Sequence, residues 1–193
     1  MENNTHFFAY ISRLPLIARW SLMRNCRAEN DAEHSMFTSV VAHALGLIGN
    51  HVFGKQLNPE RLAVLALYHD AHEVLTGDMP TPIKHNNPAI RDAYKAVETE
   101  ANARLLQTIP AVLREEYRYI LEFDPASEEG KLVKAADTIS AYVKCVEECS
   151  MGNSDFQSAK ESTAKRLKDM HIPEVDWFME NFGDSFGKTI DTL

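Results

Sequence analysis

The spacing of apolar residues is the feature that most restricts the fold of this chain. Between positions 31 and 49 they recur at intervals of three and four residues, as Met36, Phe37, Val40, Val41, Ala44, Leu45 and Ile48. This interval is the period of an amphipathic α-helix. Similar spacing runs through nearly the whole sequence, and no stretch shows a convincing strand-like alternation. The sequence therefore predicts an all-α fold.

Capping signals place the boundaries of the predicted helices. Asn30, with Glu33 three residues later, forms a capping box ahead of a helix over 31–49. Asn58 and Pro59 begin a helix that continues to about Gly77. Further helices are predicted at about 5–19, 88–108, 110–122, 127–151, 154–170 and 173–182.

The length of 193 residues suits one domain with a full hydrophobic core. The segment GDMPTPIKHNNP interrupts the helical pattern after position 76. We expect it to be a rigid loop within that domain, because the helices on both sides are needed to cover one another. We therefore predict a single helical bundle over 1–193.

Charge and cysteine content restrict the partners and the compartment. The net charge of −8 and the lack of a dense Lys/Arg run argue against long nucleic acid. A small phosphorylated ligand remains compatible. We expect no membrane span, because no apolar run approaches about 20 residues. Three cysteines without a CxxC motif, and no signal peptide, favour the cytoplasm.

The segment Tyr68–Glu73 carries most of the chemistry. Two histidines, an aspartate and a glutamate end a strongly apolar helix, which is costly unless they are paired or bound to something. Side chains of adjacent residues such as His69 and Asp70 can lean toward one metal ion. Glu73 would project from the same side one turn later. That position suits a carboxylate that transfers a proton beside a metal-bound water.

Two isolated residues extend this group. His34 lies in the first turn of the helix after the capping box, where a histidine alone indicates only a polar helix end. Asp137 lies in the apolar helix KLVKAADTISAYVKC and needs a partner, for which Lys134 is one candidate. His72 is left open as a residue behind the ligands or at the surface. His43 is predicted on the far side of its helix and not as a ligand.

The order His, His-Asp, Asp resembles the HD-domain metallophosphohydrolase superfamily. Within it, four segments look like the bacterial 5′-deoxynucleotidase of YfbR type, and the resemblance covers almost the whole chain. They are HFFAYISRLPLIARWSLMRN, the AEH around His34, YHDAHEVLTGDMPTPIK and KLVKAADTISAYVKCVEE. The resemblance implies an HD-domain bundle, a homodimer, and hydrolysis of 2′-deoxynucleoside 5′-monophosphates to deoxynucleoside and phosphate.

The resemblance also implies one divalent ion held by His34, His69, Asp70 and Asp137. Such a mixed nitrogen and oxygen set suits Co²⁺, Mn²⁺, Zn²⁺ or Fe²⁺ better than Mg²⁺, and the family implies cobalt as an activator in vitro. An octahedral ion with four protein ligands keeps positions for a water and a phosphate oxygen. We therefore expect His34, Asp70 and Asp137 to lie beside the substrate as well.

Other residues are assigned to the substrate by the resemblance. Arg19 would orient the phosphate through its guanidinium group, although the sequence without the resemblance favours a solvated cation at a helix end. Trp20 would line the sugar pocket. The loop residues Asp78, Met79, Pro80 and Thr81 would contact the substrate. Trp20 and Asp78 would crowd the 2′ position and exclude ribonucleotides. Lys84 would add positive charge near this loop.

Glu73 is the expected proton-transfer residue, and its role as general acid or general base stays open. Two alternatives remain beside the deoxynucleotidase. One is an HD phosphohydrolase acting on a cyclic nucleotide, a triphosphate or an alarmone, although a triphosphate site calls for more basic residues. The other is a metal-stabilised helical module without turnover, whose metal would be fully coordinated.

Overall fold

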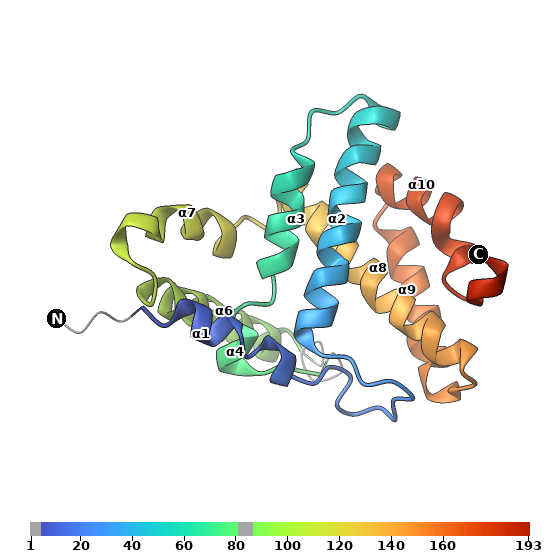
Figure 1. The fold of residues 1–193 in the computed structure, drawn as a ribbon, viewed down its shortest axis with the longest axis horizontal. Helices are drawn as coiled ribbons and strands as arrows, with labels where there is room; N and C mark the ends of the chain where they lie inside the picture. The colour runs from blue at the N-terminus through green and yellow to red at the C-terminus, as the bar shows by residue number, and fades with distance from the viewer. Residues whose placement is uncertain (1–4, 81–86) are drawn as a thin grey trace.

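The computed structural model describes residues 5–80 and 87–193 (Figure 1). Thr81 and Lys84, two of the residues predicted near the substrate, lie outside these ranges. Within them every regular element is a helix, and the pairing of Ala18 with Asn30 is an isolated bridge. The all-α prediction is confirmed. The α-helices are α1 (Phe7–Ile11), α2 (Asp31–Phe53), α3 (Pro59–Tyr68), α4 (Glu73–Thr76), α6 (Pro88–Gln107), α7 (Ala111–Leu121), α8 (Glu128–Ser150), α9 (Gln157–Asp169) and α10 (Pro173–Phe182).

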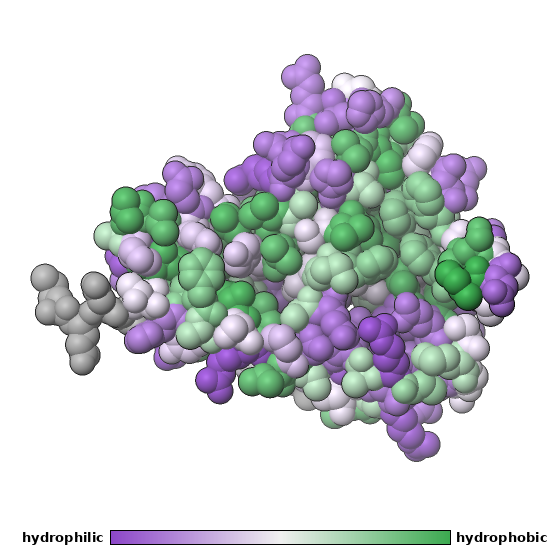
Figure 2. Space-filling view, in the orientation of Figure 1, coloured by the Kyte–Doolittle hydropathy of each residue, from purple (hydrophilic) through white to green (hydrophobic). Residues whose placement is uncertain are grey.

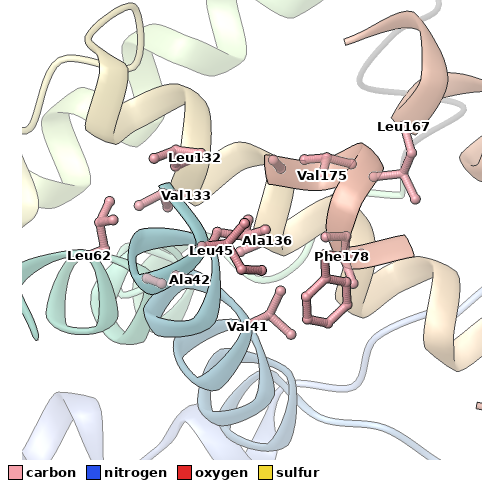
Figure 3. Close-up of a cluster of buried hydrophobic side chains, with 14 of the residues drawn as sticks. Val41, Ala42, Leu45, Leu62, Leu132, Val133, Ala136, Leu167, Val175 and Phe178 are labelled. Carbon is pink, nitrogen blue, oxygen red and sulfur yellow. The ribbon is translucent and has the colours of Figure 1, made fainter. Parts of the chain in front are cut away.

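Helix α2 lies at the centre of the larger core, between α3, α8 and α10 (Figure 1). Its buried apolar side chains meet those of the neighbouring helices, as Figure 3 shows for Val41, Leu45, Leu62, Ala136 and Phe178. By length and composition α2 could cross a bilayer. Its place at the centre of a folded core explains the same composition, so it does not indicate a membrane protein.

A smaller core joins the N-terminal helix to α6 and α7. Its buried residues are Phe7, Ala71, Leu105, Leu106, Ile109 and Leu121. Phe7 packs edge-on against Tyr117, with ring centroids 4.9 Å apart. Ala71 belongs to this core, whereas Leu65 and Ala66 belong to the larger one. The segment predicted to carry the chemistry therefore lies at the junction of the two cores.

The capping predictions are confirmed where helices start. The side-chain oxygens of Asn30, Asn58 and Ser127 each accept the backbone N–H three residues later, at 2.9–3.0 Å. The C-terminal aromatic residues pack on the larger core: Phe178 is buried, and Trp177 and Phe186 pack against it.

Two helix predictions are wrong at their ends. The helix predicted over 5–19 stops at Ile11 and is followed by the 3-10 helix η1 (Leu14–Leu16), because Pro15 has no N–H to continue the helical ladder. The helix predicted from 58 to 77 breaks after Tyr68. The His69 ring nitrogen Nδ1 lies 2.7 Å from the Ala66 carbonyl, which a continuing α-helix would offer to the N–H of Asp70. Helix α4 begins only at Glu73.

Three further 3-10 turns complete the described chain. They are η2 (Ser154–Phe156), η3 (Gly183–Ser185) and η4 (Ile190–Thr192). Of these, η2 matters for the site, because it directly follows the C-terminal end of α8 and contributes the buried ring of Phe156.

Candidate metal centre

The two predicted histidine ligands present their Nε2 atoms to a common point. His34 lies in the first turn of α2 and is fully buried. Its Nδ1 lies 3.1 Å from Ser140 Oγ, and its Nε2 lies 3.1 Å from Asp137 Oδ1. His69 holds its Nδ1 against the Ala66 carbonyl, so the ring proton belongs on Nδ1 and Nε2 carries the lone pair. This is the arrangement that prepares a histidine for a metal ion.

Two carboxylates complete the group. Asp70 Oδ2 lies 3.0 Å from His69 Nε2 and 3.7 Å from His34 Nε2. Asp137 Oδ1 lies 3.9 Å from His69 Nε2, while its other oxygen accepts from Lys134 Nζ at 2.5 Å. The structure thus brings together all four predicted ligands, from α2, the α3–α4 turn and α8.

The donor set fits a divalent transition ion. The candidate ligand atoms of His34, His69 and Asp70 all lie within 4.8 Å of one another. Among the described residues, the buried His69 Nε2 faces carboxylate oxygens of Asp70 and Asp137 and accepts no hydrogen bond, as expected of an atom that would share a cation with them. Two imidazole nitrogens with carboxylate oxygens suit the borderline ions of the first transition series.

The charges of these groups favour the binding of a cation at the point between them. Burial and the nearby Arg19 lower the pKa of His34, which favours its neutral form. Burial opposes ionisation of Asp70, but the adjacent His69 and Arg19 bring its pKa below the usual range. Burial likewise lowers the pKa of His69, and the charges of Asp70 and Asp137 outweigh it, so the net shift is upward. Ionised carboxylates and neutral imidazoles are the metal-binding forms, so a bound cation would displace the proton that Asp70 and Asp137 favour on His69.

Glu73 stands beside the ligands at the start of α4. It is 5% exposed, and its Oε2 is buried without a hydrogen-bond partner in the described part of the chain. Burial, followed by the charges of Asp70 and Asp31, raises the pKa of Glu73 to about 11. Because helix α3 breaks, Glu73 reaches this position through a turn rather than along one helix face. The Glu73 N–H donates to the Asp70 carbonyl at 2.9 Å.

Asp31 is a neighbour of Glu73 that the sequence did not reveal. It opens α2, is fully buried, and burial raises its pKa to about 6. Its Oδ1 lies 3.6 Å from Arg19 Nη1. In the sequence Asp31 has the pattern of an acidic residue in the first turn of a helix, which is normally solvated. No local signal distinguishes it from such a residue.

Arg19 is not the solvated helix-end cation that its sequence position also allowed. Its side chain is 13% exposed, with Nη1 3.4 Å from Asp70 Oδ2 and Nε 3.3 Å from Glu29 Oε2. Burial works against its charge, but Asp70, Asp137 and Glu29 raise the pKa of the guanidinium overall. The structure therefore places a permanent cation beside the candidate metal ligands.

Trp20 follows in a strained backbone conformation. Its φ of 57° lies in the left-handed region, which is uncommon for a bulky residue. Its Nε1 donates to Glu29 Oε2 at 2.8 Å, and its ring packs on Phe156 at a centroid distance of 5.3 Å. Glu29 was not predicted as a site residue, and nothing in the sequence pairs it with Arg19 and Trp20.

The loop after α4 contributes Asp78. The charge of this residue acts on the pKa values of Arg19, Asp31 and Glu73, so it lies near all three. Met79 and Pro80 follow and are half-buried. The chain reaches them through Gly77, whose φ of 71° is a conformation that favours glycine.

The open prediction for His72 is resolved in favour of a buried position. Its Nε2 lies 3.6 Å from Glu98 Oε1 on α6, and one of its ring nitrogens lies within 4.8 Å of carboxylate oxygens of Asp70 and Glu73. His43 is half-buried on α2 and belongs to neither group of potential ligands found among the described residues.

Comparison with known proteins agrees with this geometry. Residues 6–186 match the family described as 5′-deoxynucleotidase YfbR-like. A 5′-deoxynucleotidase from Pectobacterium atrosepticum is 50% identical over 192 residues, covering 99% of this chain and 96% of that protein. One from Photorhabdus temperata is 50% identical over 190 residues, covering 98% and 96%.

Solved structures share the fold. An HD-domain phosphohydrolase from Listeria innocua superposes with a TM-score of 0.81 at 22% identity, over 94% of this chain and 88% of that one. A cyanophage S-2L HD phosphohydrolase, bound to dA and one catalytic Zn²⁺ ion, gives a TM-score of 0.64 at 25% identity, over 94% and 96% of the two chains.

Proposed function

The chain belongs to the YfbR-like family of 5′-deoxynucleotidases, and from that premise we propose which residues carry the reaction. The substrate class is a 2′-deoxynucleoside 5′-monophosphate, which is hydrolysed to deoxynucleoside and phosphate. We propose that His34, His69, Asp70 and Asp137 hold one divalent ion. The observation that carries this assignment is the convergence of the four side chains from three parts of the chain, with Arg19 beside them.

When bound, the ion would supply a Lewis acid that activates water and screens the phosphate charge. Arg19 would grip the phosphate through its guanidinium group, since a buried arginine with a fork of donors recognises two phosphate oxygens at once. Glu73 would hold or move the proton that is exchanged with the attacking water and the leaving 5′-oxygen. Its buried carboxyl, close to Asp70, is the support for that role.

The sugar would lie between Trp20 and the loop after α4. We propose that Trp20 and Asp78 crowd the 2′ position, and that Met79, Pro80 and Thr81 contact the substrate, Thr81 lying outside the described residues. The fixed indole of Trp20, bonded to Glu29 and packed on Phe156, supports the assignment. So does the location of Asp78 near Arg19 and Glu73.

The resident metal is proposed as a first-row transition ion, with Co²⁺ active in vitro and Zn²⁺, Mn²⁺ or Fe²⁺ as alternatives. The catalytic Zn²⁺ of the cyanophage relative supports this class. We further propose one HD domain over 1–193, a cytoplasmic location, and a homodimer. An exposed apolar surface, here called the α2–α3 face, supports the dimer. It consists of Met36, Val40, Leu47, Val64 and Leu67.

The proposed roles separate in a comparison of Glu73→Ala with His69→Ala. We expect Glu73→Ala to bind Co²⁺ like the wild type but to lose about 100-fold or more in kcat on dAMP, because only proton transfer is removed. His69→Ala should lose both Co²⁺ binding and turnover, since a ligand is missing. Calorimetric Co²⁺ titration and release of phosphate are the measurements, and chelator should abolish wild-type turnover.

His43→Ala is the matched control, a histidine on the same protein outside the candidate centre, and it should keep both properties. A near-normal rate for Glu73→Ala would contradict its role. Equal cleavage of AMP and dAMP would contradict exclusion at the 2′ position. A panel of cyclic nucleotides and triphosphates tests other substrates. If the protein binds metal but turns over none of these compounds, it is a structural module.

A further inference from the structure

The segment from Arg19 to Asn30, here called the recognition loop, lies between η1 and α2 (Figure 1). Its two ends are joined. The Arg19 N–H donates to the Glu29 carbonyl at 3.0 Å, and the Asp31 N–H donates to the Ile17 carbonyl at 3.1 Å. The loop is therefore closed at its base, where the Arg19 side chain reaches Asp70 of the candidate metal centre.

One carboxylate oxygen joins the two proposed substrate-binding side chains. Glu29 Oε2 accepts from Arg19 Nε at 3.3 Å and from Trp20 Nε1 at 2.8 Å. The side chain of Glu29 is 14% exposed, so solvent competes weakly for these bonds. The orientation of the guanidinium and that of the indole are consequently coupled through Glu29.

The far end of the loop is held by a second carboxylate, that of Glu148 near the C-terminal end of α8. It is fully buried and accepts the backbone N–H groups of Cys26 at 2.8 Å and Arg27 at 3.1 Å. It also accepts Asn153 Nδ2 at 2.7 Å and forms an ion pair with Lys144. A buried carboxylate with four donors is fully compensated, which makes it a rigid anchor.

Its two side-chain partners hold the loop as well. Lys144 Nζ donates to the Arg27 carbonyl, and Asn153 Nδ2 donates to the Arg24 carbonyl at 2.6 Å. The same end of α8 leads into η2, whose Phe156 supports the Trp20 ring. Lys144 Nζ lies 5.6 Å from the centroid of that Phe156 ring. Anchor and indole support thus come from one part of the fold.

We propose that Glu29 and Glu148 are positioning residues that hold the recognition loop as a preformed wall of the nucleotide site. Glu29 fixes Arg19 relative to Trp20, and Glu148 fixes the loop on α8. The consequence is that phosphate binding and discrimination against the 2′-hydroxyl depend on Glu29, although it is not assigned any contact with the substrate. This inference rests on the proposed function and extends it to residues that determine specificity.

The first test is Glu29→Ala, with Glu29→Gln as the conservative variant. We expect Glu29→Ala to raise KM for dAMP about 10-fold and to change kcat by less than about twofold, because binding geometry is lost and the reacting groups are kept. The preference for dAMP over AMP should fall. Glu29→Gln keeps one acceptor oxygen and should lie between Glu29→Ala and the wild type.

Two further measurements do not depend on turnover. The affinity for Co²⁺ should be unchanged in Glu29→Ala, because Glu29 contacts none of the proposed ligands. In a Trp177→Phe background Trp20 is the remaining tryptophan, and its emission should shift toward that of a solvated indole. Glu33→Ala is the matched control, since this exposed carboxylate pairs with Arg27 of the same loop and touches neither Arg19 nor Trp20.

The anchor is tested by Asn153→Ala and Glu148→Gln. If Glu148→Gln folds poorly, Asn153→Ala still tests the anchor, because it leaves the buried Lys144–Glu148 pair intact. Both should accelerate amide hydrogen exchange at Cys26 and Arg27. Unchanged KM, unchanged dAMP preference and unshifted Trp20 emission in Glu29→Ala would overturn the proposal. If the wild-type protein cleaves no deoxynucleotide, the proposed function is refuted instead. Trp20 emission and hydrogen exchange would still decide whether the loop is held as described.

Discussion

His34 and His69 owe their readiness for a metal to the atoms behind them. Ser140 Oγ lies 3.1 Å from His34 Nδ1, and the Ala66 carbonyl lies 2.7 Å from His69 Nδ1. Each partner fixes the ring orientation and, for His69, the tautomer, so that Nε2 faces the carboxylates. Loss of such a partner behind a ligand typically costs about 10- to 100-fold in metal affinity or activity.

Replacing Ser140 with alanine should therefore weaken metal binding without removing a ligand. We expect the affinity for Co²⁺ or Zn²⁺ to fall by about 10-fold, because the His34 ring loses its orienting partner. Calorimetric titration of the metal-free protein measures this directly. Ser150→Ala is the control, since that hydroxyl donates to the Glu147 carbonyl at the exposed end of the same helix. Equal affinities for both variants would contradict the role of Ser140.

Among the elements, helix α8 has two functions. Its middle supplies Asp137 and Ser140 to the candidate centre, and its last turns hold the recognition loop through Lys144 and Glu148. Burial alone would raise the pKa of Glu148. The hydrogen bonds from Lys144, Cys26 and Asn153 outweigh burial and lower it from 4.5 to about 2.

This shift predicts a pH dependence of stability. A carboxyl whose pKa is lowered by folding stabilises the native state above its ordinary value of 4.5. That stabilisation is lost as the pH falls from 4.5 toward about 2. Urea unfolding of the wild type should therefore show a decline in the free energy of unfolding over this range, with a smaller decline for Glu148→Gln. If the free energy of unfolding declines equally with falling pH in the two proteins, Glu148 does not contribute to this pH dependence.

At the scale of the whole molecule, two cores meet at the candidate centre. The larger core holds α2, α3 and α8 together, and the smaller one places α1, α6 and α7 against the α3–α4 turn. On the outside, hydrophobic residues gather over the middle of α2 and the adjacent part of α3 (Figure 2). Val40, at 56% exposure, lies within this α2–α3 face. Contiguous exposed apolar surface of this kind is typical of an interface.

We expect the wild type to be a homodimer and Val40→Asp to be a monomer. A buried, unpaired carboxylate at an apolar interface is strongly unfavourable, whereas the same residue in water costs little. Sedimentation velocity measures the outcome, with Co²⁺ affinity as a check that the monomer is folded. Val112→Asp on α7 is the control, since Val112 is also an exposed valine, at 86% exposure, but lies outside the face. A dimeric Val40→Asp protein would place the interface elsewhere.

The sequence by itself determined the helical class and most helix starts, and it predicted the four residues that the structure brings together as the candidate metal centre. These features depend on local information. The apolar period reports one helix at a time, and the caps at Asn30, Asn58 and Ser127 involve backbone groups three residues away. The proposed ligands were found because their pattern resembles a family, with the burial cost of a charged helix end as independent support.

Only the tertiary structure decided how those residues work together. The break after Tyr68 depends on the His69 ring, which takes the Ala66 carbonyl from the helical ladder. The burial of Asp31 and the partners of Glu29 depend on which segments pack around them. Ser140 and His34 are 106 positions apart, yet their side chains lie 3.1 Å from each other. Contacts between such distant segments leave no periodic or capping signal, because the free energy that fixes them comes from packing the whole chain.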